Sequence, residues 1–352
     1  MLAAQYISWF ADIGLDDRPK VGGKGGSLGE LERAGITVPP GFVVRTEAFE
    51  DFIEALERRG AVRARVEGLI ADELEGMRAV SRELRARIEE TPMPPELQQQ
   101  IRDAYARLGE SGPAPAPAVA VRSSATTEDA ADASFAGLQD TYLWVGEADA
   151  VIAKIRSCWA SLYSVESLNY RRRQGIAESA VAMAVVVQVM VDARTAGVMF
   201  TRSPLSGDRS VITIEGAWGL GSALVGGEVT PDHWVVGKIT GEISVRDISD
   251  KAIRHAQAPA GGVEELPVEE SQRREPCLSD EELQSLRAIG RQIERHYGRP
   301  QDIEWAIDRH TRQIMLLQSR PETVWSNKDP ASAATRVSDP LLHVMKIFGG
   351  QR

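Results

Sequence analysis

Hydrophobic residues recur with the period of an α-helix through residues 46–108, a stretch rich in Glu, Arg, Leu and Ala that the run TPMPP at 91–95 interrupts. The same period runs through 150–170. Residues 279–297 are amphipathic and begin with acidic side chains, which favour the positive end of a helix dipole. The pattern therefore predicts a helical block in the N-terminal half and two later helices.

Other segments carry the signature of strands. The run VAMAVVVQVMV at 181–191 has the length and the β-branched content of a buried strand. The polar segment 252–280 lacks apolar periodicity and predicts a surface loop. A glycine-rich stretch at 21–29 precedes the predicted end of a helix at 30–34. Shorter runs predict strands at 36–44, 118–122, 197–201, 211–215 and 233–236, and a hairpin at 302–308 and 313–320.

This mixture of helices and strands predicts an α+β fold. The 352 residues exceed what a single core usually holds, so we expect two lobes with a cleft between them. We place an N-terminal lobe with the glycine-rich loop and the helical block at 1–183 and a C-terminal lobe at 184–322. The remaining tail, 323–352, contains no recognisable domain.

Charge and composition narrow the function classes. The formal net charge of −10 argues against binding to nucleic acid or to an anionic membrane surface. No apolar run reaches the length of about 18 residues that a transmembrane helix needs, and the first residues do not resemble a secretory signal. The two cysteines, Cys158 and Cys277, stand far apart and form no zinc or disulfide pattern. We therefore expect a cytoplasmic protein.

A lysine surrounded by glycines is the first candidate for chemistry. In Val21-Gly22-Gly23-Lys24-Gly25-Gly26, the glycines let the backbone approach an anion while Lys24 supplies a point charge. The order of residues differs from a Walker A loop. A plain glycine-rich turn before a helix explains the same letters equally well.

Arg122 is the second candidate. It ends a predicted strand and is followed by the hydroxyl side chains of Ser123, Ser124, Thr126 and Thr127, which together offer donors to phosphate oxygens. The alternative is an N-capped turn before a helix that begins at Glu128. Both interpretations are compatible, but only the first explains the arginine.

Two strands hold the remaining candidates. Gln188 lies inside the run 185–191, whose end could bind an adenine ring, although a plain buried strand explains the run too. In the hairpin, strand alternation places Gln318 and Arg320 on one face. A loop with an odd number of residues would place Glu304 directly opposite Gln318. A carboxylate and an amide oxygen beside a guanidinium suit Mg²⁺ between protein and phosphates, whereas the alternative is a solvated polar pair. No HExxH motif is present, and no Ser/His/Asp order of a hydrolase lies near a nucleophile elbow.

Taken together, the motifs resemble one family. GGKGGSLGEL…VPPGF, AVRSSATTEDAADASFAGLQDTYL, GVMFTRSP, EGAWGLGSALVGGEVTPD and DIEWAID…LLQSRP are similar, in order, to the N-terminal domain of phosphoenolpyruvate synthase. The same module occurs in pyruvate phosphate dikinase, rifampin phosphotransferase and the phenylphosphate synthase subunits. The resemblance implies an ATP-grasp fold that binds ATP and Mg²⁺ between two lobes.

By motif position, the resemblance also implies a set of site residues. Lys24, Arg122 and Arg320 would contact phosphates, and Thr141 would lie near the phosphate chain. Glu304 and Gln318 would ligate Mg²⁺. The residues lining the adenine pocket would be Gln188, Val189, Met190 and Val191.

The chain also departs from the family. Relatives usually continue with a domain that holds a phospho-accepting histidine in a TSH-type motif, and no histidine of this chain has such a setting. The first loop reads GGKGG where synthases commonly have GGKNA. We therefore expect a dedicated subunit, similar to the ATP-binding subunit of phenylphosphate synthase, that works with a partner carrying the histidine.

The leading hypothesis is a dikinase-type phosphotransferase that converts ATP to AMP and phosphate while it phosphorylates the partner's histidine. The DIEWA and GEVTPD blocks favour this AMP-forming type. The final acceptor would be phenol or a related aromatic, pyruvate, or an antibiotic hydroxyl. The alternatives are a non-catalytic ATP sensor, the truncated nucleotide domain of a longer synthase or rifampin phosphotransferase, and a carboxylate–amine ligase.

Overall fold

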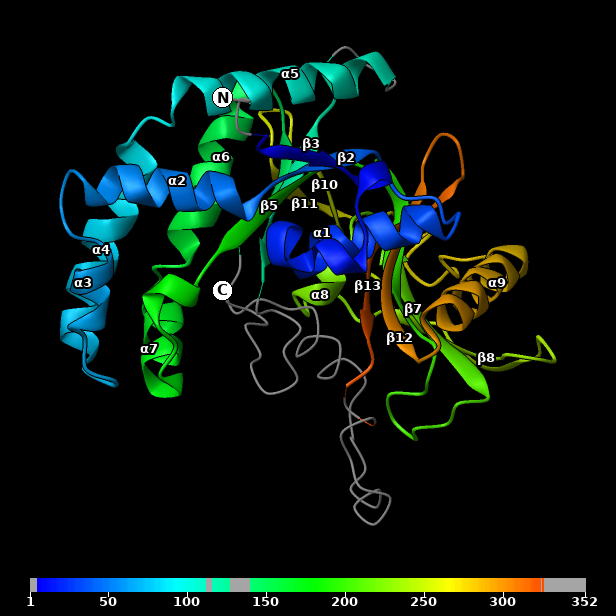
Figure 1. Cartoon of the computed structure of the whole chain (residues 1–352). Helices are drawn as coiled ribbons and strands as arrows, with labels where there is room; N and C mark the ends of the chain where they lie inside the picture. The colour runs from blue at the N-terminus through cyan, green and yellow to red at the C-terminus, as the bar shows by residue number, and fades with distance from the viewer. Residues whose placement is uncertain (1–4, 112–115, 127–139, 324, 326–352) are drawn as a thin grey trace. The chain divides into compact units, whose positions relative to one another are not determined.

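A computed structural model of the protein describes residues 5–111, 116–126, 140–323 and 325. The chain divides into two compact units (Figure 1). Among the described residues, the first unit holds 5–30 and 40–190, and the second holds 31–39, 191–323 and 325. The chain passes from one unit to the other between Met190 and Val191. The expected boundary at 183/184 therefore falls at the start of a strand that belongs to the first unit.

The first unit is built on a five-stranded antiparallel sheet in the order β1-β2-β5-β3-β4. Its strands are β1 (Ile7–Trp9), β2 (Gly41–Val44), β3 (Val119–Ala125), β4 (Thr141–Val145) and β5 (Met183–Val189). Its helices are α1 (Arg18–Arg33, whose last turn enters the second unit), α2 (Thr46–Glu57), α3 (Arg63–Glu67), α4 (Leu74–Glu90), α5 (Pro95–Ser111), α6 (Ala148–Ser161) and α7 (Val165–Gln174). Short 3₁₀ turns lie at Phe10–Asp12, Leu15–Asp17 and Glu178–Ala180.

One face of this sheet is covered by the helical block. Alternate strand residues such as Phe42, Val121 and Val187 share a buried core with residues of α2 and α4 to α6. Trp159 of α6 is fully buried there and packs against Phe52, with ring centroids 5.1 Å apart. Replacing such a buried ring with alanine typically lowers the free energy of unfolding by about 3–5 kcal/mol, so this core stabilises the unit strongly.

The second unit is built on a six-stranded antiparallel sheet in the order β13-β12-β6-β7-β8-β9. Its strands are β6 (Ala193–Phe200), β7 (Val211–Trp218), β8 (Asp232–Gly237), β9 (Ile243–Asp247), β12 (Gln301–Asp308) and β13 (Ile314–Pro321). A separate ribbon pairs β10 (Ile253–Gln257) with β11 (Val263–Pro267). The helices are α8 (Ser222–Val225) and α9 (Asp280–Tyr297). Antiparallel sheets with helices gathered beside them confirm the α+β class.

Helix α9 covers one face of this sheet. Leu283, Leu286 and Ile293 pack with strand residues that include Trp234 and Trp305. The helix begins at a capping box, in which Ser279 accepts from the Glu282 N–H and Glu282 accepts from the Ser279 N–H. It ends at Gly298, which is left-handed with φ 67°. The prediction of an amphipathic helix at 279–297 is confirmed.

Two sequence predictions differ from the structure. Residues 252–280 were expected to form a loop, but 253–257 and 263–267 pair as the ribbon β10–β11. Its strands are polar because most of their side chains are exposed or only half-buried. The glycine-rich stretch 21–29 was expected to precede the last helical residues, but it lies inside α1, which is kinked at Gly22. A Cβ on Gly25, Gly26 or Gly29 would lie 3.1, 2.9 or 2.5 Å from a neighbouring atom, so the close packing of α1 requires glycine there.

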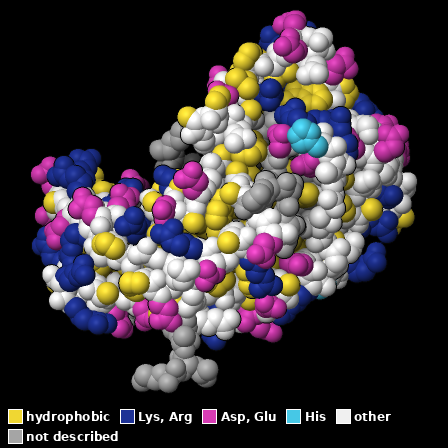
Figure 2. All heavy atoms as spheres, turned by 90° about the horizontal axis from the view of Figure 1, so that it is seen from above, with side chains coloured by type: hydrophobic (Ala, Val, Ile, Leu, Met, Phe, Trp, Pro, Cys, Tyr) yellow, Lys and Arg dark blue, Asp and Glu magenta, His cyan; other side chains and the backbone are white. Residues whose placement is uncertain are grey.

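The surface mixes charges of both signs. Figure 2 shows basic and acidic side chains interspersed over the visible face, with small separate apolar areas. Among the described residues, no helix has the length and hydropathy of a membrane span.

Candidate functional site

The kink in α1 fastens this helix to strand β3. The Ser124 hydroxyl donates to the Val21 carbonyl at 3.0 Å and accepts from the Gly25 N–H at 3.2 Å. Gly22 has φ 69° and ψ 178°, and a Cβ placed on it would lie 2.1 Å from the Ser124 carbonyl oxygen. Only glycine fits this position. The contact brings the half-buried Lys24 to the strand that carries Arg122.

Arg122, Thr141 and Gln188 lie on one face of the first unit's sheet. Thr141 is the direct partner of Arg122 in β4, and Val186 is its partner in β5. Because side chains alternate along a strand, Gln188 shares the face of Val186. This face also carries Ser124 and is opposite the face that the helical block covers. The structure therefore brings four predicted residues of the first unit, Lys24 included, to one side of its sheet.

The three residues after Gln188 contribute differently. Val189 packs its side chain against the helical core, and its N–H donates to the Pro40 carbonyl at 2.8 Å. The Met190 N–H donates to the Ala118 carbonyl at 2.9 Å. Val191 is buried and begins the second unit. The N–H groups of Val189 and Met190 are thus already used by the fold, and Gln188, 2% exposed, keeps a polar side chain in the strand.

Part of the second candidate motif lies outside the described residues. These are Thr127, Glu128 and the block 134–137, so the predicted helix at Glu128 stays a prediction. Of the hydroxyl groups that the structure describes, Ser123 donates to the Asp140 carbonyl at 3.2 Å. Ser123 and Ser124 therefore each have a structural partner, whereas Thr141 is exposed.

In the second unit, β12 and β13 form the predicted hairpin, but their loop, 308–313, has an even number of residues, and a bulge rather than an odd loop sets the pairing beyond it. Glu304 lies directly opposite Gln318, and Asp302 lies directly opposite Arg320. A bulge between Glu304 and Trp305 follows these two pairs. Opposed residues of antiparallel strands point to the same side, so all four polar side chains share the face that is opposite α9.

Asp302 does not stand out from the sequence pattern of the hairpin. It is buried, and the Arg320 Nε lies 3.8 Å from one of its carboxylate oxygens. Burial raises the pKa of Asp302 to about 7, Arg320 opposes this rise, and Glu322 adds to it. The sequence could have indicated Asp302, because it precedes Glu304 by two residues and strand alternation puts both side chains on one face.

Glu215 extends the same polar face across the sheet. Cross-strand partners lead from Glu304 to Val198, then to Glu215 and then to His233. Glu215 is 1% exposed, with Oε1 3.2 Å from the His233 Nδ1 and with no hydrogen-bond partner for Oε2 among the described residues. A buried carboxylate oxygen without a partner is costly, so this oxygen suits a cation or a donor from a bound molecule.

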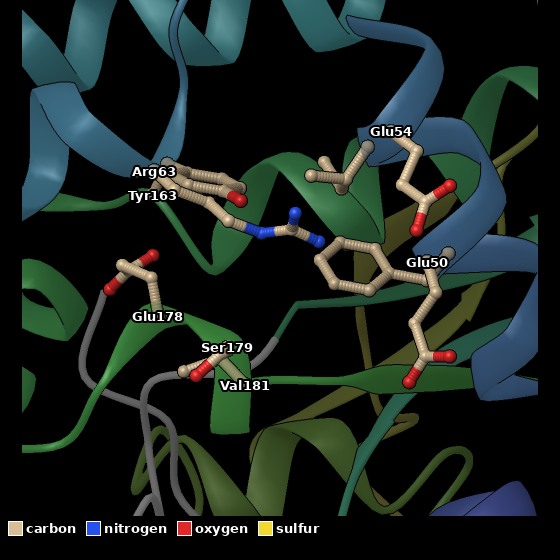
Figure 3. A pocket seen from close by; sticks show the side chains of 9 residues that line it. Glu50, Glu54, Arg63, Tyr163, Glu178, Ser179 and Val181 are labelled. Atoms are coloured by element: carbon tan, nitrogen blue, oxygen red, sulfur yellow. The ribbon is translucent and has the colours of Figure 1, made fainter. Parts of the chain in front are cut away.

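A pocket of about 190 Å³ in the first unit involves none of the predicted residues. It lies between α2 and the segment 178–181, with Arg63 pointing into it between Glu50 and Glu178 (Figure 3). Glu178 forms a buried ion pair with Arg171 at 3.1 Å, and burial raises its pKa. The remaining lining residues are Phe49, Ile53, Glu54, Tyr163, Ser179 and Val181.

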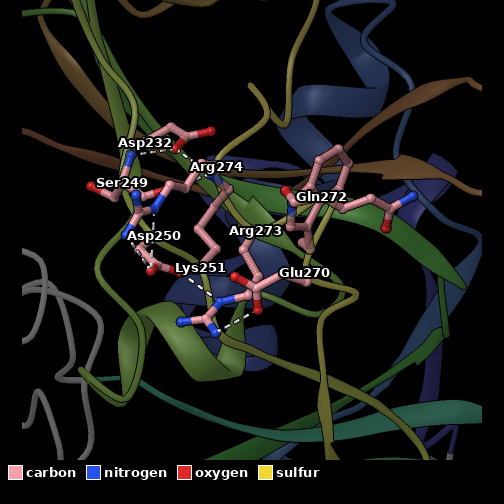
Figure 4. A network of polar contacts seen from close by, with 9 residues as sticks. Asp232, Ser249, Asp250, Lys251, Glu270, Gln272, Arg273 and Arg274 are labelled. Atoms are coloured by element: carbon pink, nitrogen blue, oxygen red, sulfur yellow. Dashed lines mark hydrogen bonds and ion pairs between the residues drawn. The ribbon is translucent and has the colours of Figure 1, made fainter.

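A buried ion pair fixes the segment that follows β9. The Lys251 Nζ lies 2.6 Å from an Asp232 oxygen, and neither side chain is exposed (Figure 4). Asp232 also accepts from the N–H groups of Ser249 and Cys277, both at 2.9 Å. Every oxygen of this carboxylate therefore has a donor, and the network ties residues 249–277 to strand β8.

The sequence is similar to one protein family and to several synthases over most of its length. The family described as "Pyruvate phosphate dikinase, AMP/ATP-binding domain" matches residues 18–339. The phosphoenolpyruvate synthase of Aeropyrum pernix is 41% identical over 361 residues, covering 94% of this chain and 44% of that protein. The probable phosphoenolpyruvate synthase of Archaeoglobus fulgidus is 43% identical, covering 95% of this chain and 43% of that protein.

A third relative, the probable phosphoenolpyruvate synthase of Methanothermobacter thermautotrophicus, is 42% identical, covering 91% of this chain and 46% of that protein. The chain thus spans less than half the length of these relatives. Because the family match covers most of the chain, the protein belongs to the pyruvate phosphate dikinase AMP/ATP-binding domain family, whose fold is of the ATP-grasp type.

Proposed function

We propose that the chain is the ATP-binding part of a phosphotransferase similar to phosphoenolpyruvate synthase. The register of β12 and β13 carries this proposal, because it sets Glu304 and Gln318 beside Asp302 and Arg320 on one face. Carboxylate and amide oxygens are ligands that Mg²⁺ accepts, and Mg²⁺ usually completes its shell with substrate phosphates and water. The adjacent guanidinium suits a phosphate oxygen.

The first unit supplies the complementary charges in this proposal. Lys24 and Arg122 are held at the junction of α1 and β3, and Thr141 offers a hydroxyl opposite Arg122. Phosphoryl transfer depends on positioning and on neutralising charge, and both sets of residues supply that. We propose that these residues bind ATP. Gln188 and residues 189–191 would serve its adenine.

In the proposed reaction, ATP and water yield AMP and phosphate while one phosphoryl group is transferred to a histidine nitrogen of another polypeptide. The partner would then pass the phosphoryl group to the final acceptor, which is phenol or a related aromatic, or pyruvate. The chain spans less than half the length of these synthases, and none of its histidines lies in a TSH-type motif. Both cysteines are buried thiols, which suits a cytoplasmic enzyme.

The proposal is tested by incubating the purified chain with Mg-ATP and a lysate of its source organism. Mass spectrometry under alkaline conditions identifies any phosphohistidine, and chromatography separates AMP from ADP. We expect AMP, phosphate and one protein labelled on histidine. The chain alone should turn ATP over slowly or not at all.

Glu304→Ala and Glu275→Ala form a matched pair for this assay. Glu275 is exposed and lies outside the proposed site. We expect Glu304→Ala to lower histidine labelling by at least about 100-fold, the scale on which loss of a preorganised electrostatic contact lowers kcat, and Glu275→Ala to leave it unchanged. ADP without phosphohistidine would instead support a ligase. ATP binding with no labelled protein would support a sensor or the truncated domain of a longer synthase.

A further inference from the structure

Three side chains with metal-binding atoms converge where the ribbon β10–β11 meets the loop that follows α8. Glu228 comes from that loop, His255 from β10 and Glu265 from β11. Their ligand atoms all lie within 4.8 Å of one another. All three belong to the second unit, and the proposed ATP site uses none of them.

The backbone is shaped to bring this loop onto the ribbon. Gly219 pairs with His255 as an isolated bridge, and the Leu220 N–H donates to the His255 carbonyl at 3.0 Å. Gly219 has φ 77°, and a Cβ on it would lie 2.4 Å from that carbonyl oxygen. The approach therefore requires glycine, and it fixes the position of the strand that carries the imidazole.

A second close approach directs Glu228 toward the imidazole. The Glu228 N–H donates to the Ala223 carbonyl at 2.9 Å, which ends the turn after α8. A Cβ on Gly226 would lie 2.8 Å from the Glu228 Oε1, so the carboxylate occupies the space that a side chain at 226 would take. Its other oxygen, Oε2, lies 3.1 Å from the His255 Nε2.

The third ligand is set by strand register, and the imidazole by a hydroxyl. Glu265 is the direct cross-strand partner of His255. The His255 Nδ1 lies 2.8 Å from the Ser222 Oγ, and the residue is 7% exposed. When the Nδ1–H donates to this hydroxyl, the Nε2 lone pair faces the carboxylates. Metal-binding histidines are usually held through their second nitrogen in this way.

We propose that Glu228, His255 and Glu265 bind a first-row divalent metal ion, with Zn²⁺ as the reference case. Bond lengths of about 2.0–2.2 Å place tetrahedral ligand atoms roughly 3.4 Å apart, so the observed cluster needs only a small side-chain adjustment. Two carboxylates balance the charge of the ion. The imidazole favours zinc, cobalt or nickel over magnesium, which prefers oxygen ligands.

The exposed Glu265 gives the ion a route from solvent, and water would complete the shell. A bound ion would join the ribbon to the α8 loop. The competing structure is an imidazolium ion pair with the same carboxylates. A metal ion at Nε2 would replace this ion pair, so the competing structure would show no metal affinity.

The test uses the full chain without a histidine tag, free of nucleotide, in buffer containing Mg²⁺ to occupy sites that prefer oxygen ligands. Co²⁺ is titrated while its visible absorption is recorded, and Zn²⁺ binding is measured by calorimetry. We expect one equivalent bound and a cobalt spectrum of low coordination number.

Three variants and one matched control decide the assignment. His255→Gln and Glu265→Gln should weaken Zn²⁺ binding at least about 100-fold, and Ser222→Ala about 10-fold, as loss of an outer hydrogen bond typically does. Glu264→Gln removes the same charge one position along β11, on the other side of the ribbon, and should change nothing. The exposed Glu265 gives a readout even if His255→Gln fails to fold. No saturable Zn²⁺ binding by the wild type, or equal loss in Glu264→Gln, would overturn the proposal.

Discussion

Gly22 and Ser124 are in direct backbone contact, although 102 positions of sequence separate them. A Cβ on Gly22 would lie 2.1 Å from the Ser124 carbonyl oxygen and 2.3 Å from its hydroxyl. The Ser124 hydroxyl in turn bonds to Val21 and Gly25 on either side. The position of Lys24 relative to Arg122 therefore depends on this contact.

Gly22→Ala should displace α1 from β3 and abolish ATP binding. The backbone conformation of Gly22 is one that is essentially restricted to glycine and costs other residues about 1–3 kcal/mol, before the clash is added. Gly35→Ala is the control, because Gly35 also has positive φ, 71°, but has nothing within 4 Å of its would-be Cβ. Gly35→Ala should lower stability by only about 1 kcal/mol and keep ATP affinity. Calorimetry with Mg-ATP and urea unfolding measure both; equal ATP affinity of the two variants would contradict the role of the contact.

Asp302 should make the stability of the protein depend on pH in an unusual direction. Burial raises its folded pKa to about 7, while an unfolded aspartate titrates near about 3.9. Between these values the native state binds more protons than the unfolded state, so the free energy of unfolding falls as pH rises. The slope contributed by this group approaches about 1.4 kcal/mol per pH unit and disappears above the folded pKa.

Asp302→Asn removes this contribution. We expect the stability of the variant relative to wild type to rise between pH 4 and pH 7 and then to level off, in urea unfolding at several pH values. Arg320→Met should move the plateau to higher pH, because Arg320 opposes the rise in the pKa of Asp302. A constant difference between Asp302→Asn and wild type across this range would rule out the raised pKa.

Much of the fold follows from local pattern. The helical period of 46–108 became α2 to α5, and the apolar run at 181–191 contains β5. The shared face of Gln318 and Arg320 also followed from alternation. These features are predictable because burial of a periodic apolar face decides them locally.

Other features depend on contacts distant in sequence. Gly25 and Gly29 lie inside α1, where Val43 and Ile13 occupy the space that a side chain would need. The ribbon β10–β11 has polar strands that no apolar period reveals, and the Ala258 N–H bond to the Gly262 carbonyl closes its turn. Helix and strand propensities describe single residues and their sequence neighbours, so they do not predict contacts between distant segments.

The candidate site was predictable in part for the same reason. Lys24 and Arg122 stand out as cations in unusual sequence settings, but their association depends on the Ser124 hydroxyl. Glu215 gave no signal, because a single acid in an apolar strand has many explanations. Glu215 becomes a candidate only through strand pairing, which places it in one cross-strand row with Glu304 and His233.

Lys251→Met should destabilise the second unit strongly. The substitution keeps the side chain long but leaves Asp232 charged and fully buried without its ammonium partner. Breaking one side of a buried ion pair typically costs about 3–5 kcal/mol. Urea unfolding checks this, with Asp250→Asn as the control, since that carboxylate pairs with Arg273 at the surface. A small effect of Lys251→Met, similar to that of the control, would mean that water enters the network and replaces the ammonium.

Substitutions of Lys24 and Gln318 should differ in whether their effect on ATP affinity requires Mg²⁺. If Lys24 neutralises phosphate directly, Lys24→Met should weaken both ATP and Mg-ATP by about 10–100-fold, the range expected for a charge-assisted hydrogen bond. If Gln318 holds the cation, Gln318→Leu should weaken Mg-ATP but leave binding of ATP in EDTA unchanged. Lys20→Met is the matched control, because Lys20 is an exposed lysine on the same helix. Affinities measured by calorimetry with and without Mg²⁺ separate the two roles. An equal loss in EDTA for Gln318→Leu would show that the amide contacts the nucleotide itself and not the metal.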